Sequence, residues 1–106
     1  MRAVPGGPPD LTGEWIGRYP GHFDEIVHIT RTGDRVEAVK LTGDENVPAG
    51  ETTWRADLFT LQGEGQVAEA EFHHPRFIPG RLEIVNPDLI VFHWQNAGAV
   101  EFRRDD

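Results

Sequence analysis

Apolar and polar residues alternate along most of this chain in short runs, and turn-forming residues separate the runs. The alternation has the period of two that half-buried β-strands show. Turn signals recur roughly every 8 to 14 residues, a spacing typical of β-sandwiches and barrels. No segment keeps the period of about 3.6 that a helix needs. The predicted strands are Thr12–Tyr19, Phe23–Arg31, Arg35–Thr42, Thr52–Gln62, Gln66–Phe72, Gly80–Val85, Leu89–Gln95 and Ala99–Arg103.

Alternation also gives each predicted strand an inner and an outer face. The inner positions are nearly all apolar: Trp15, Gly17, Tyr19, Val27, Ile29, Val39, Leu41, Trp54, Ala56, Leu58, Ala68, Ala70, Phe72, Leu82, Ile84, Ile90, Phe92, Trp94, Val100 and Phe102. The outer positions are polar or charged: Glu14, Arg18, His28, Lys40, Arg55, Asp57, Glu69, Glu71, Arg81, Glu83 and Glu101. The pattern predicts an all-β fold, a small antiparallel up-and-down β-barrel of about eight strands. Because the inner set is rich in large side chains, we expect a filled interior and a binding site at a mouth.

The length of 106 residues fits one domain. Residues 1–10 hold three prolines and two glycines and are expected to form a flexible lead-in. Residues 11–103 are expected to form the barrel and residues 104–106 a tail, within a frayed end that starts at Arg103. No segment has the apolar pattern of a signal peptide or a membrane span, so a cytoplasmic location is expected.

Charge and composition narrow the choice of partners. Ten basic and eighteen acidic residues give a formal charge of −8, which disfavours binding to nucleic acid or to an anionic membrane. The chain has no cysteine, so disulfides and thiolate chemistry are excluded. We expect a monomer, or a weak homodimer through the outward apolar residues Ile26, Val36, Leu89 and Val91.

The sequence offers no pattern of catalytic or metal-binding residues. His28 and His93 are predicted on outer faces, His22 in a turn, and the adjacent His73 and His74 diverge on extended backbone, so no metal site is expected. The chain has no serine and therefore no GxSxG motif, and its carboxylate pairs fall mainly on solvated faces. We expect a protein that is not an enzyme and carries no cofactor.

Two stretches interrupt the strand pattern. The loop Gly43–Glu51 is dense in Gly, Pro, Asp and Asn, and it has two interpretations: a set of turns in which Asp and Asn bond their own backbone, or a binding loop at a mouth. The stretch Phe72–Gly80 is either a barrel corner plugged by Phe77 or a mouth where Arg76 and Phe77 grip a peptide or carboxylate. In addition, Gly63–Gly65 is predicted to be a turn between strands.

An ordered series of segments resembles a known family. The segments are Trp15-x-Gly17-x-Tyr19, Glu25–Val27, Ala38–Gly50 and Phe72–Gly80, and the most specific is Thr42-Gly-Asp-x-Asn-Val-Pro-Ala-Gly50. The series covers nearly the whole chain and resembles the C-terminal substrate-recognition domain of F-box only protein 31 and the C-terminal domain of the plant EXECUTER proteins. The resemblance implies a β-barrel that binds protein C-termini, including ends that carry a primary amide. These residues contain no F-box, so recruitment of a ubiquitin ligase is not carried over.

The chemistry of an amide end then suggests which residues would bind it. A primary amide offers donors that a carboxylate lacks, so a nearby carboxylate would accept from the amide and repel an ordinary C-terminus. Asp44 and Asn46 are the predicted reading pair, and the predicted ligand-binding set is Thr42, Asp44, Asn46, His74, Arg76, Phe77 and Trp94. The predicted function is a non-enzymatic module that binds a protein or peptide C-terminus. The alternative is a lipocalin-like barrel for a small hydrophobic molecule, which would need an open lumen around Gly17.

Overall fold

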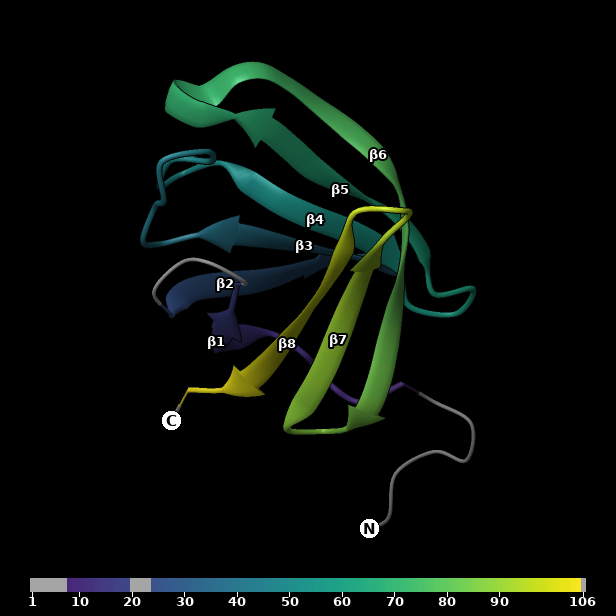
Figure 1. Ribbon diagram of the computed structural model, residues 1–106. Helices are drawn as coiled ribbons and strands as arrows, with labels where there is room; N and C mark the ends of the chain where they lie inside the picture. Colours follow the sequence, from purple (N-terminus) through teal and green to yellow (C-terminus); the bar gives the residue numbers. More distant parts are fainter. Residues whose placement is uncertain (1–7, 20–23, 106) are drawn as a thin grey trace, which may run out of the picture.

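The protein is a closed antiparallel β-barrel whose strands pair in chain order, with β8 returning to β1 (Figure 1). The computed structural model describes residues 8–19 and 24–105; the turn predicted at His22 and the predicted strand start at Phe23 lie outside them. The strands are β1 (Gly13–Arg18), β2 (Glu25–Thr32), β3 (Arg35–Lys40), β4 (Thr52–Asp57), β5 (Gln62–Glu69), β6 (His73–Asn86), β7 (Leu89–Trp94) and β8 (Gly98–Arg104). Among the described residues the only helical segment is the 3-10 turn η1 (Ala70–Phe72). No helix in this part of the chain is long and apolar enough to cross a membrane. The predicted all-β, up-and-down barrel is confirmed.

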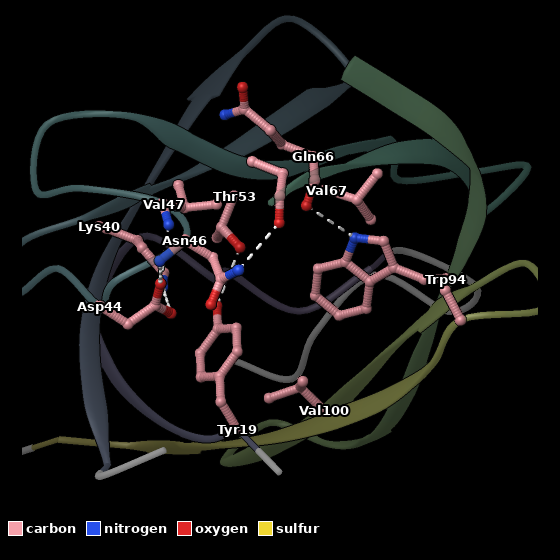
Figure 2. A pocket seen from close by; sticks show the side chains of 12 residues that line it. Tyr19, Lys40, Asp44, Asn46, Val47, Thr53, Gln66, Val67, Trp94 and Val100 are labelled. Carbon is pink, nitrogen blue, oxygen red and sulfur yellow. Dashed lines mark hydrogen bonds and ion pairs between the residues drawn. The ribbon is translucent and has the colours of Figure 1, made fainter. Parts of the chain in front are cut away.

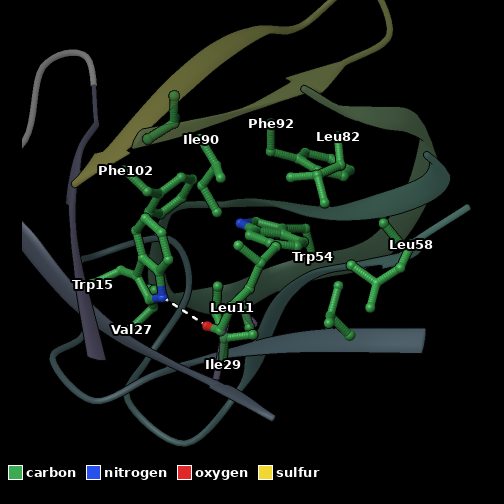
Figure 3. Packing of buried hydrophobic residues seen from close by; sticks show 14 of the residues in the cluster. Leu11, Trp15, Val27, Ile29, Trp54, Leu58, Leu82, Ile90, Phe92 and Phe102 are labelled. Carbon is green, nitrogen blue, oxygen red and sulfur yellow. Dashed lines mark hydrogen bonds between the residues drawn. The ribbon is translucent and has the colours of Figure 1, made fainter. Parts of the chain in front are cut away.

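Aromatic side chains fill the barrel interior (Figure 3). Trp54 stacks on Phe92 with ring centroids 5.0 Å apart, and it meets Phe102 edge to face at 5.8 Å. Such pairs contribute about 0.5–1.5 kcal/mol beyond the burial of their surface. A Cβ atom added to Gly17 would lie 2.5 Å from the Phe102 ring, so the space beside this glycine is occupied. The interior therefore offers no open lumen at the position where a lipocalin-like ligand was expected.

The inner face of β3 differs from the prediction. Val36, Ala38 and Lys40 are buried, whereas Val39 is half-buried and Leu41 is 47% exposed. Both alternations fit the local sequence, and burial of an unpaired lysine would be costly. Asp44 supplies the missing partner, so the inward lysine is tolerated. Val36 consequently cannot contribute to the predicted dimer face.

The boundaries between β4, β5 and β6 also differ from the prediction. β4 ends at Asp57, whose Oδ1 accepts hydrogen bonds from the backbone N–H groups of Phe59 and Thr60 at 2.8 and 2.9 Å. Such an aspartate turn closes the hairpin earlier than the apolar pattern indicated. Residues 63–65, predicted as a turn, belong to β5 and pair with β4. Ala70, which was predicted to point inward from the fifth strand, is exposed and belongs to η1.

β6 is a strand of 14 residues, so the corner predicted over Phe72–Gly80 is wrong. Within the described part of the chain, Gly80 and Arg81 pair with both β5 and β7, the paired residues before them pair with β5, and those after them pair with β7. Prolines are tolerated where a strand has a neighbour on one side only, because the missing N–H then interrupts no ladder. Pro75 and Pro79 lie in this part, which explains why a proline-rich stretch is a strand.

The barrel is closed beside the end of β8. Arg104 donates from its guanidinium to the carbonyl oxygens of Thr12, Asp10 and Pro87 at 2.9, 2.8 and 3.0 Å. The same group lies 4.3 Å from the centre of the Trp15 ring. β8 therefore extends one residue into the segment predicted as a tail, and Arg104 joins the residues before β1 to the β6–β7 turn.

Candidate functional site

A cavity of about 250 Å³ opens at the end of the barrel where β1, β3, β5 and β7 end (Figure 2). It is lined by Tyr19, Lys40, Asp44, Asn46, Val47, Thr53, Gln66, Val67, Ala68, Trp94, Ala97 and Val100. The loop between β3 and β4 and the β7–β8 turn contribute to its walls. The cavity thus lies at a mouth, as expected for a barrel with a filled interior, and its size suits a few non-hydrogen atoms of a ligand chain end rather than a large molecule.

Trp94 forms the apolar floor of the cavity together with Val67 and Val100. Its indole Nε1 donates to the backbone oxygen of Gln66 at 3.2 Å, which satisfies the one polar atom of the ring. Gly65 makes this position possible, because a Cβ there would lie 2.2 Å from Nε1. The glycine in β5 is therefore a packing requirement of the mouth.

Lys40 and Asp44 form a buried ion pair in the cavity wall. The side chain of Lys40 is 1% exposed and that of Asp44 8% exposed. The ammonium also lies 4.4 Å from the centre of the Tyr19 ring, a favourable cation–π position. In the described part of the chain these are the two charged groups that line the cavity, and their charges are opposite and cancel.

Asp44 also shapes the loop that carries it. Its Oδ1 accepts from the backbone N–H groups of Asn46 and Val47 at 2.8 and 2.7 Å, and the backbone N–H of Asp44 donates to the Val47 oxygen at 3.0 Å. Burial raises the pKa of the Asp44 carboxyl, but the bonds from Lys40 and from the two backbone amides outweigh it and lower the pKa below its ordinary value. Asp44 therefore bonds its own loop backbone, as the turn interpretation predicts, and it also lines the cavity, while its role in binding stays a prediction.

Asn46 fixes the loop to the hairpin formed by β5 and β6. Its side-chain Nδ2 donates to the backbone oxygen of Ala68 at 3.0 Å. A second contact, from the Glu71 N–H to the Glu45 oxygen at 2.7 Å, joins the same loop to the hairpin tip. The side-chain amide of Asn46 thereby occupies the place that a backbone N–H of a neighbouring strand would occupy beside this carbonyl oxygen of β5.

The remaining polar groups of the cavity are neutral. The Tyr19 hydroxyl and the Thr53 hydroxyl lie 2.9 Å apart, and Gln66 donates from Nε2 to the Thr52 oxygen at 2.6 Å. Burial raises the pKa of Tyr19 far above its ordinary value, so its hydroxyl keeps its proton. The cavity therefore combines hydroxyl and amide groups with an apolar floor.

Three of the seven predicted binding residues line the cavity: Asp44, Asn46 and Trp94. Thr42 faces the barrel wall instead. Its hydroxyl accepts from the Ile26 N–H and donates to Oε1 of Glu25, both at 2.9 Å. Thr42 thus fastens the start of the loop to β2.

The other three predicted residues lie on β6, outside the cavity lining. His74 is exposed at the hairpin tip, with Nδ1 at 3.5 Å from a Glu69 carboxylate oxygen. Arg76 is exposed and donates to the His74 backbone oxygen at 3.1 Å. Phe77 lies beneath the Arg55 guanidinium, which is 4.1 Å from the ring centre. In the described part of the chain no three His, Asp or Glu side chains gather as metal ligands.

Sequence reasoning missed most of the cavity lining, above all Lys40. A signal was present: Lys40 is the chain's one lysine beside nine arginines, and it continues the inward alternation of Val36 and Ala38. It also precedes Asp44 by four residues. Tyr19 and Val100 were correctly assigned to the interior, but alternation does not show which inner residues lie near a mouth.

Comparison with known proteins matches two overlapping parts of the chain, residues 5–62 and 58–104, to the family described as "Cyclin D1 binding domain". The chain is 27% identical over 122 aligned residues to EXECUTER 2, chloroplastic, of Oryza sativa subsp. japonica, an alignment that covers 86% of the chain and 20% of the relative. For EXECUTER 2, chloroplastic, of Arabidopsis thaliana the identity is 31%, over 70% of the chain and 17% of the relative. F-box only protein 31 of Homo sapiens is 43% identical over 51% of the chain and 10% of the relative. The chain therefore spans a fifth or less of the length of these relatives.

Proposed function

The chain belongs to the Cyclin D1 binding domain family, and we propose that it is a non-catalytic module that binds a protein or peptide C-terminus in the mouth cavity. The family description names a binding activity and no reaction. We infer that the partner of this chain is a protein, and that the bound end is one that carries a primary amide.

The neutral balance of the cavity wall is the observation that carries this proposal. A free C-terminal carboxylate is costly to bury unless a positive charge or several hydrogen-bond donors compensate for its lost hydration. Among the described residues that line the cavity, Lys40 is the only cation, and Asp44 already neutralises it. A primary amide is uncharged and both donates and accepts hydrogen bonds, so it suits the hydroxyl and amide groups of Tyr19, Asn46 and Thr53. The net charge of −8 disfavours a carboxylate at longer range as well.

The test is a binding titration of the purified protein with matched peptides that end in an amide or in a free carboxylate. We expect the amide to bind at least about tenfold more tightly, equivalent to about 1.4 kcal/mol. We also expect Asp44→Ala to abolish this preference, because Lys40 then carries an unpaired charge. Glu45→Ala is the matched control, since it removes an exposed carboxylate from the next position in the same loop. Equal binding of both peptides by the wild-type protein would refute amide selectivity.

A second pair of variants tests the location. Ala97 lines the cavity from the β7–β8 turn, whereas Ala99 is exposed and outside the lining. Ala97→Trp is expected to obstruct the cavity and weaken peptide binding by about tenfold or more, and Ala99→Trp to leave it within about twofold. If neither variant binds the peptide more weakly than the wild-type protein, the peptide binds elsewhere on the molecule.

A further inference from the structure

The first half of β6 has an open edge beside the cavity. His73 and residues 76–79 pair with β5 across an irregularity at residues 74–75, but pairing with β7 begins only at Gly80. Figure 1 shows the β5–β6 hairpin continuing past the end of β7 and arching away from the β7–β8 turn. An unpaired strand edge presents backbone hydrogen-bonding groups to whatever extended chain lies beside it.

The ladder fixes which groups point outward. Gln95 donates from its backbone N–H to the Pro79 oxygen at 2.9 Å, so the backbone groups of Pro79 point away from β5. In an antiparallel pair this direction recurs at every second residue. Phe77 therefore directs its N–H and its C=O outward, and Pro75 directs its C=O outward. No hydrogen bond joins these groups to any residue that the structure describes.

This edge borders the mouth cavity. Arg76 pairs with Val67, which lines the cavity, and Ala97 lines it from the β7–β8 turn. A peptide whose end lies in the cavity and which leaves it between Val67 and Ala97 would pass along the edge at Phe77. Three outward groups spaced along one strand match the donors and acceptors of an extended peptide.

We propose that the residues preceding the bound C-terminus pair with residues 75–77 as an additional β-strand. This inference rests on the proposed function and adds to it the conformation and class of the ligand. The occupant is an extended peptide segment that is not acidic. Exposed glutamates at positions 45, 69 and 71 surround the hairpin tip, and they favour a segment that carries lysine or arginine.

Position 77 allows the backbone donor to be removed by itself. Proline already occupies positions 75 and 79, which have the same outward direction, so Phe77→Pro removes an N–H that β5 does not use. Phe77→Ala is the matched control, because it removes the ring that contacts Arg55 but keeps the N–H. The probe is the tightest-binding member of a randomised decapeptide pool with a common C-terminal amide. Circular dichroism and thermal unfolding serve as the controls that check whether both variants are folded.

We expect Phe77→Ala to bind the probe within about twofold of the wild-type protein and Phe77→Pro to bind it about fivefold more weakly than Phe77→Ala. N-methylation of successive probe residues should weaken binding at alternate positions only, as a strand pairing requires. Equal affinity of the two variants, together with retained amide preference, overturns the edge pairing and leaves the proposed function standing. If the wild-type protein binds no peptide from the pool, both inferences are refuted.

Discussion

The carboxylate of Asp44 accepts hydrogen bonds from one ammonium group and two backbone amides. All three bonds favour its ionised form, which is why its pKa is lowered although burial acts in the opposite direction. A group whose pKa is lower in the folded than in the unfolded protein stabilises the fold above its unfolded pKa. This stabilisation is lost as the pH falls through the folded value.

Asp44→Ala is expected to lower the free energy of unfolding by roughly 3 kcal/mol near neutral pH, because Lys40 is left buried without a partner. The difference from the wild-type protein should shrink as the pH falls from the ordinary aspartate value of 3.8 through the lower pKa of the folded state, since protonation of the wild-type carboxyl removes the charge that pairs with Lys40. Urea unfolding of both proteins at a series of pH values measures it. A difference that is constant with pH would mean that the charge of Asp44 contributes nothing.

Two buried tryptophans differ in a way that can be measured. Trp15 donates from Nε1 to the buried Leu11 oxygen at 2.9 Å, whereas Nε1 of Trp54 has no hydrogen-bond partner among the described residues. Trp15→Phe loses a bond and leaves a buried acceptor, so we expect it to cost about 1–3 kcal/mol more than Trp54→Phe. Chemical denaturation of both variants tests this, and the reverse order would contradict the assignment of the bond.

At the scale of single elements, sequence alternation succeeded where large apolar residues lie on one face only. The buried apolar residues of β1, β2, β4, β7 and β8 were predicted from this pattern, but the buried polar residues Glu25 and Thr53 were not. It failed on β3, where two apolar alternations compete and the decision depends on a partner in the following loop. It also failed on β5 and β6, where glycines and prolines usually mark turns. There their role depends on whether a neighbouring strand is present, which a single segment does not reveal.

The face of β3 can be tested directly. Val36 is 1% exposed and Leu41 is 47% exposed, although the sequence had suggested the opposite. Val36→Ala should cost roughly 1–3 kcal/mol because it leaves a cavity in the core, and Leu41→Ala should change stability by less than about 0.5 kcal/mol. Thermal unfolding of both variants shows which face of β3 points inward. A larger loss of stability for Leu41→Ala than for Val36→Ala would mean that the face with Val39 and Leu41 points inward.

At the scale of the whole molecule, the candidate site is assembled from parts that are distant in sequence. Asp44, Asn46 and Trp94 were predicted as binding residues and line the cavity, and Asp44 and Trp94 are 50 positions apart in the chain. Thr42, His74 and Arg76 were chosen from the same two stretches and lie outside the lining. A motif identifies a loop, but the direction of each side chain follows from the barrel around it. The closure of β8 on β1, which brings Val100 beside Tyr19, has no signal in either local sequence.

The contribution of this closure to the stability of the barrel can be measured at Arg104. Arg104→Ala removes three bonds to carbonyl oxygens and the contact with Trp15, so we expect it to cost roughly 2 kcal/mol. Arg103→Ala is the control, since its side chain is 68% exposed and forms a surface ion pair with Glu101; a change below about 0.5 kcal/mol is expected. Equal losses in the two variants, measured by urea unfolding, would show that Arg104 does not join the ends of the barrel.

The burial of Lys40 has a consequence for the chemical reactivity of the domain. Because it is the one lysine in these 106 residues and only 1% of its side chain is exposed, the folded barrel presents no lysine amine to acylating reagents or to enzymes that modify lysines. Acylation of Lys40 requires the ion pair to separate and the loop over the mouth to lift. The ratio of that rate to the rate at an unprotected amine therefore measures the fraction of time in which Lys40 is accessible through local opening. A ligand seated in the cavity would slow it further, so the lysine serves as a built-in reporter of occupancy.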